Sequence, residues 1–159
     1  ALRQHLKMLT IFDIADNWAC EDITIGKWEE QIQKELLDSD IVIYMLSANF
    51  FSSSYIREKE VLEVMKQMRE NPNKKILPVI VSEFVGLDSL KELITNPTDV
   101  QTAMLDISNH QFSCYGNVWN HLNEQNEEKI ISLEEHRKNQ SLNKALKQIC
   151  DKIVELYKK

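Results

Sequence analysis

The sequence has few of the residues that bend or cross-link a chain. Its 159 residues include three glycines, three prolines and three cysteines. So few turn-forming residues argue against a β-sandwich or barrel, in which many strands are joined by tight turns. Gly26, Gly86 and Gly116 also lie too far apart to build a GxGxxG motif or a P-loop. The scarcity therefore argues against a β-sandwich or barrel and excludes a glycine-built phosphate cradle.

The cysteines and histidines show no metal-binding or disulfide pattern. Cys20, Cys114 and Cys150 are odd in number, widely separated and without a CxxC pair, so neither a zinc site nor a disulfide framework is indicated. This use of cysteine fits a reducing compartment. The four histidines lack the spacing of metal ligands. We expect no metal site.

Long apolar runs and excess positive charge are also missing. The longest apolar run, residues 41–46, is far too short to span a bilayer, and no signal peptide is visible. The formal charge is −6, from 19 basic and 25 acidic residues. Such a chain is poorly suited to binding a phosphate backbone. We therefore expect no membrane and no direct nucleic-acid partner.

Two continuous apolar stretches, residues 40–47 and 75–82, indicate the centre of the fold. Both are rich in β-branched residues and do not alternate with polar ones, which is typical of parallel strands buried on both faces. Pro78 has no amide hydrogen to donate, so the second strand should bulge there or lie near an edge of the sheet.

Helical periodicity surrounds these strands. It predicts helices over residues 1–9, 27–37, 55–70 and 87–94, with Ser54 as the cap of the third. A C-terminal helix carries one apolar stripe, made of Leu142, Leu146, Ile149, Ile153 and Leu156. Residues 100–107 could form a short edge strand or a loop, and residues 123–129 should be exposed. The order of elements predicts a single three-layer α/β domain over residues 1–159.

The segment after the first strand is a candidate ligand site, because ligands bind outside the carboxyl ends of parallel strands. Residues 47–55 contain four serines, two phenylalanines and a tyrosine. Hydroxyl groups beside aromatic rings suit a ligand with sugar hydroxyls and planar rings. The alternative is a polar loop whose serines cap turns and the next helix.

Glu60 follows on the helix that this segment opens. Ile56 lies four residues before it and Val64 four after, so the three share one line on the helix. A carboxylate there would point toward the sheet edge, where it could meet a sugar diol or stabilise positive charge in a transition state. Otherwise it is an ordinary solvated glutamate. Periodicity does not choose between Glu60 and its neighbours Glu58 and Glu63.

Trp18 and the loop over residues 21–26 form a further candidate cluster. Ile23 and Ile25 near the tip of the loop would make an adhesive assembly surface if exposed. Alternatively, both isoleucines are buried in an ordinary connection.

Taken together, these segments resemble the Toll/interleukin-1 receptor (TIR) domain in its bacterial form. Residues 22–28 are similar to the family's BB loop, which typically follows W-D-x-x-I-x-P-G-x-x-W, and residues 49–60 to S-x-x-F-x-x-S-x-Y-x-x-x-x-E. The other matching segments, in order, are residues 5–9, Trp18, residues 39–47 and residues 76–80. The resemblance covers residues 1–84 and, loosely, the last helix.

The chain departs from the family pattern in several places. The strand with which the family's fold opens has no counterpart, so we expect it to be missing from this chain. Ile25 stands where the BB-loop proline is usual, Ala19 replaces a common aspartate, and the loop is one residue shorter. Residues 96–138 match no part of the family pattern.

The resemblance implies a flavodoxin-like fold with a central parallel sheet. It also implies an enzymatic activity. Many bacterial TIR domains cleave the nicotinamide–ribose bond of NAD⁺, which is their substrate, so no cofactor is expected. The family's essential glutamate falls on Glu60. The residues implied to bind substrate are Ser47, Phe50, Ser52, Ser54, Tyr55 and Trp18.

The resemblance also implies partners and a setting. Such domains become active when copies pack through the BB loop, here Asp22, Ile23, Ile25, Gly26 and Lys27. The expected protein is cytoplasmic, carries or meets a sensor module, and depletes NAD⁺ in antiviral defence. The alternative is a TIR scaffold that binds other proteins without catalysis, favoured by the missing strand and the altered loop.

Overall fold

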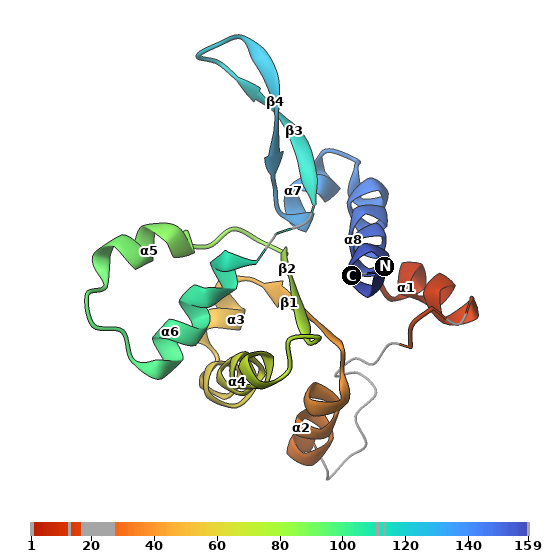
Figure 1. Cartoon of the computed structure of the whole chain (residues 1–159). Coiled ribbons are helices and arrows are strands. Elements are labelled where there is room, and N and C mark those ends of the chain that lie inside the picture. The colour runs from red at the N-terminus through yellow and green to blue at the C-terminus, as the bar shows by residue number, and fades with distance from the viewer. Residues whose placement is uncertain (1, 13, 17–27, 111, 113, 159) are drawn as a thin grey trace.

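Two parallel strands lie at the centre of the computed structural model, which describes residues 2–12, 14–16, 28–110, 112 and 114–158 (Figure 1). Strand β1 (Ile41–Leu46) pairs with β2 (Lys75–Ile80), with Tyr44 opposite Pro78. The two predicted strands are confirmed. The register is unbroken, so the bulge at Pro78 does not form. Among the described residues the sheet has these two strands, and β2 therefore lies at an edge, where proline is tolerated.

Helices cover both faces of the pair, which confirms the three-layer α/β architecture (Figure 1). Val42, Tyr44 and Leu46 face one core, and Leu77 and Val79 face the other. The first core includes side chains from α2 (Trp28–Asp38), α3 (Ala48–Ser52), α4 (Leu62–Glu70), α5 (Leu87–Leu93) and α6 (Asp99–Asp106), and from the short helices η2 (Ile56–Val61) and η3 (Ile107–Asn109). The second includes side chains from α1 (Leu2–Ile11), α7 (Leu133–Lys138) and α8 (Leu142–Lys158). The alternation follows from the pleat, which points successive side chains to opposite faces.

The predicted helix over residues 55–70 is present from residue 54 onward; it contains a π-helical segment, η2 (Ile56–Val61), and continues as α4. At their junction the amide of Leu62 donates to the carbonyl of Arg57, five residues back. The predicted cap is wrong by one residue. Ser53, three residues before Ile56, accepts the amide of Ile56 through its hydroxyl at 3.3 Å, whereas Ser54 is exposed.

Residues 100–107 form neither a strand nor a loop. They belong to α6 and to the short helix η3 (Ile107–Asn109) that follows it. A capping box starts α6: the hydroxyl of Thr98 accepts the amide of Gln101 at 3.2 Å, and the side chain of Gln101 accepts the amide of Thr98 at 2.8 Å. Because Ala103 and Leu105 are buried against the core, the helix is also held by packing. The predicted helix at residues 87–94 is present as α5 (Leu87–Leu93).

A β-hairpin extends away from the layers (Figure 1). Its strands are β3 (Tyr115–Asn120) and β4 (Gln125–Ile130), and residues 123–129 are mostly exposed, as predicted. Buried His136 on α7 (Leu133–Lys138) anchors the base. Its ring nitrogens lie 3.0 Å from the carbonyl oxygen of Cys114 and 2.8 Å from the hydroxyl of Ser141. The hairpin is therefore tied to the body near its first strand.

A buried lysine holds the end of α2 beside the sheet. The ammonium of Lys74 donates to the carbonyl of Ser39 at 2.6 Å and to that of Leu36. Burial lowers the pKa of Lys74, and nearby Asp40 and Asp38 act in the opposite direction. A cation is favourable at a helix C-terminus, where carbonyls lack partners within the helix.

Replacing Lys74 by methionine should lower the free energy of unfolding by about 2 kcal/mol. The substitution leaves the carbonyls at the end of α2 without their donor, and an unpaired buried polar group carries a penalty of this size. Lys75→Met is the matched control, because the Lys75 ammonium makes an exposed bond to Pro72. Urea denaturation of both variants checks this, and equal losses would contradict it.

Candidate functional site

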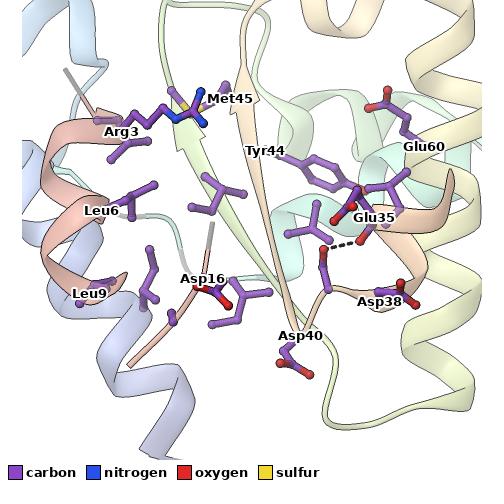
Figure 2. Close-up of a pocket in the computed structure, with 18 of the residues that line it drawn as sticks. Arg3, Leu6, Leu9, Asp16, Glu35, Asp38, Asp40, Tyr44, Met45 and Glu60 are labelled. Carbon is purple, nitrogen blue, oxygen red and sulfur yellow. Dashed lines mark hydrogen bonds between the residues drawn. The ribbon is translucent and has the colours of Figure 1, made fainter. Parts of the chain in front are cut away.

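A cavity of about 1290 Å³ runs along the edge of β1 that faces away from β2 (Figure 2). Its walls come from both helical layers. Leu6 and Leu9 of α1 line one side, while Ile32 and Glu35 of α2 line the other. The cavity therefore follows from the arrangement of the described residues, in which helices cover both faces of β1 and no second strand pairs with this edge.

Glu60 reaches the cavity from η2 (Figure 2). Ile56 of the same segment also lines the cavity. This confirms that the two side chains share one line on the helix and that the Glu60 carboxylate turns toward the sheet edge. Glu58 is exposed, and Glu63 accepts a hydrogen bond from Gln67 at 3.4 Å. Of the three glutamates that periodicity left open, Glu60 is the one that lines the cavity. It also stands on a π-helical turn, a feature often found at functional sites.

The environment of Glu60 disfavours its charge. The side chain is half-buried, and desolvation raises the pKa of its carboxyl group. Arg57, on the same segment, donates to the carbonyl of Phe51 at 2.9 Å. Within the described part of the chain, the Glu60 carboxylate has no hydrogen bond and no ion pair. The group is therefore available to a ligand.

Further carboxylates surround the same cavity. Asp16, Glu35, Asp38 and Asp40 line it beside Glu60, and Arg3 is the cationic side chain among its described lining residues (Figure 2). A concave site with acidic walls concentrates cations and disfavours anions. The charge pattern therefore suits a cationic or hydroxyl-bearing group.

An aromatic row backs the site. The ring of Tyr44 lies 5.4 Å from that of Phe50, which is 5.2 Å from Phe51, and Phe51 is 4.9 Å from Phe84. Tyr44 and Phe50 both line the cavity. Phe50 was predicted from the sequence as a substrate-binding residue, and Tyr44 was not. Tyr44 could have been noticed in the sequence, because it places a hydroxyl group in an otherwise apolar strand.

The other predicted residues of the segment after β1 do not line this cavity. Ser47 caps α3 by accepting the amide of Phe50 at 3.1 Å, and Ser52 donates to a backbone carbonyl of α3 at 3.0 Å. Ser54 is exposed and Tyr55 is half-buried. Ser47 and Ser52 thus have the capping roles that were the alternative interpretation. A substrate role for these four residues stays a prediction.

Trp18 and the predicted assembly loop lie outside the described residues. The loop was predicted to consist of Asp22, Ile23, Ile25, Gly26 and Lys27. Its part in self-association stays a prediction.

The described residues contain no group of three or more His, Cys, Asp or Glu side chains that could hold a metal ion. No helix within them has the length and apolar character needed to cross a bilayer.

The raised pKa of Glu60 predicts how stability depends on pH. Because the folded chain holds this proton more tightly than the unfolded chain, its contribution is present at acidic pH and is lost as pH rises through the raised pKa. Glu60→Gln should therefore raise the melting temperature at neutral pH and flatten the fall in stability between acidic and neutral pH. Glu58→Gln, at an exposed position, should do neither. Thermal unfolding of both variants from pH 4 to pH 8 checks this, and parallel curves would contradict it.

A family model described as the TIR domain matches residues 2–113 of the chain. The matched range is more than half of the sequence and runs from α1 to just past η3, so it includes both parallel strands and Glu60. The hairpin and α8 lie beyond it. Comparisons with curated proteins and with solved structures gave no match. The range and the architecture agree, and the chain belongs to the TIR domain family.

Proposed function

We propose that this TIR domain is an NAD⁺ nucleosidase in which Glu60 is the catalytic carboxylate. The observation that carries the proposal is the position of Glu60: half-buried, without a protein partner among the described residues, and lining a cavity at the edge of the central sheet. The TIR family, as the sequence resemblance implies, includes enzymes that cleave NAD⁺ with a glutamate at the matching position.

The chemistry needs one well-placed negative charge. When the bond between nicotinamide and ribose breaks, its electron pair leaves with nicotinamide, which departs as a neutral molecule. The ribose is left with oxocarbenium character, and water then adds to it and releases a proton. A carboxylate against the ribose stabilises the developing positive charge, as in glycoside cleavage. Because Glu60 is partly shielded from water, its charge acts on the ribose more strongly than an exposed one would.

The charge of the cavity supports one orientation of the substrate. The acidic lining, which includes Glu35, Asp38 and Asp40, attracts the positively charged nicotinamide ring and repels the diphosphate. In the proposed complex the nicotinamide–ribose end therefore enters the cavity and the diphosphate stays toward solvent.

The proposal extends to assembly. Self-association through the loop of Asp22, Ile23, Ile25, Gly26 and Lys27 would activate the enzyme, under the control of a fused or separate sensor module. Such a protein would act in the cytoplasm and deplete NAD⁺ in antiviral defence.

Glu60→Gln should reduce nicotinamide release about 100-fold or more, the range expected when a preorganised charge is removed from an active site. Glu58→Gln should retain wild-type turnover, because its side chain is exposed. The measurement is incubation of artificially clustered protein with NAD⁺ and chromatography of the products. Wild-type turnover in folded Glu60→Gln protein would contradict the assignment.

A non-catalytic scaffold is the second candidate, favoured by an exposed apolar group at the end of α1. Met8, Ile11, Phe12 and Ile14 leave between 44% and 71% of their surface exposed, and exposed apolar patches mark interaction sites. Clustered wild-type protein that binds itself but releases no nicotinamide would support the scaffold and overturn the enzyme.

A further inference from the structure

The hydroxyl of Tyr44 is buried without a hydrogen-bond partner among the described residues. The side chain is only 3% exposed, so bulk solvent does not reach it. An unpaired buried hydroxyl lowers stability, and phenylalanine would fill the same space without that penalty. A tyrosine at this position is therefore unexplained by packing alone.

Backbone and packing fix where this hydroxyl lies. The pleat of β1 places Tyr44 on the same face as Val42 and Leu46, both buried, and its ring rests against Phe50. Tyr44 and Glu60 line the same cavity. Figure 2 shows Tyr44 extending from β1 to the side on which Glu60 lies. The ring is held in place before any ligand arrives.

Tyr44 and Glu60 have complementary hydrogen-bonding capacity. Burial, and next the charge of Glu60, raise the pKa of Tyr44 far above neutral, so its hydroxyl keeps its proton and can donate. An ionised Glu60 can only accept. A hydroxyl group of a ligand can do both at once, by donating to the carboxylate and accepting from the phenol.

We propose that Tyr44 is a substrate-binding residue, whose hydroxyl donates to a hydroxyl oxygen of the nicotinamide ribose while Glu60 accepts the proton of that same sugar hydroxyl. This inference rests on the proposed function. In this proposal the unpaired Tyr44 hydroxyl on β1 donates to the sugar. The ribose is then bound by the strand as well as by the helix that carries Glu60.

Tyr44→Phe tests the inference, because it removes one oxygen and keeps the ring. The dissociation constant of ADP-ribose should rise about tenfold, which is 1.4 kcal/mol. The melting temperature of the free protein should stay the same or rise, since the variant removes an unpaired buried group. If Tyr44 had only a structural role, the variant would leave the dissociation constant of ADP-ribose unchanged and lower the melting temperature. Tyr115→Phe, on the hairpin and away from the cavity, is the matched control.

Analogues of NAD⁺ identify the contact. If Tyr44 donates a hydrogen bond to one hydroxyl of the nicotinamide ribose, Tyr44→Phe should lower kcat/KM for NAD⁺ about tenfold. It should have little effect for either the 2′-deoxy or the 3′-deoxy analogue, whichever lacks that hydroxyl. Equal losses for all three substrates would overturn the inference.

The outcomes separate this inference from the proposed function. Wild-type cleavage and ADP-ribose affinity in Tyr44→Phe would overturn the inference alone. A wild-type protein that releases no nicotinamide, yet binds ADP-ribose through Tyr44, would overturn the nucleosidase and keep the ribose contact. Wild-type protein that neither releases nicotinamide from NAD⁺ nor binds ADP-ribose at millimolar concentration would overturn both.

Discussion

Burial of both faces of β1 is the constraint on which the rest of this structure depends. Val42 and Leu46 pack into one core, and Ile41 and Ile43 pack against the other. In the part of the chain that the structure describes, helices cover both faces of the strand, so a ligand would approach it along the edge away from β2 or at its ends. The cavity lies along that edge, so its place is a consequence of the layering. The same layering brings α1, α2 and η2 around one strand.

The polar groups at this edge lower the stability of the folded chain, and in the proposed function they bind the substrate. Desolvation of Glu60 and the unpaired hydroxyl of Tyr44 both lower the stability of the folded chain. Functional sites commonly carry such penalties, because a group that the protein leaves unsatisfied can be satisfied by a ligand. In the proposed enzyme, the same shielding from water that raises the pKa of Glu60 would also strengthen its field at the ribose.

The central layers could be predicted from sequence because their signals are local. Residues 40–47 and 75–82 are continuous apolar runs, and Leu146, Ile149 and Ile153 repeat at helical spacing. The direction of Glu60 was predictable for the same reason, since spacing from Ile56 fixes its face. Its choice over Glu58 came from the family resemblance and not from periodicity, because burial of a helix residue depends on what packs against it.

The remaining features depend on contacts or on weaker signals. The capping box of Thr98 and Gln101 is visible in the sequence and was overlooked, because residues 100–107 also read as a strand. The hairpin has no apolar alternation in β4, where five of the six side chains are polar or charged. Whether the Tyr44 hydroxyl has a partner is decided by residues distant in sequence, so no pattern within β1 could indicate it.

The scarcity of glycine and the charge of the cavity both indicate that a dinucleotide would be recognised through its nicotinamide–ribose end. Three isolated glycines provide no loop whose amides could enclose a diphosphate, and the described lining adds carboxylates such as Glu35 and Asp40 to Glu60. A dinucleotide would therefore gain little from its phosphates inside this cavity. Its affinity would have to come from the nicotinamide ring, whose positive charge the carboxylates favour, and from the ribose hydroxyls. Because a sugar hydroxyl both donates and accepts, a fixed phenol beside a carboxylate binds it in one orientation. That orientation would place the reacting carbon of the ribose against the charge that stabilises it.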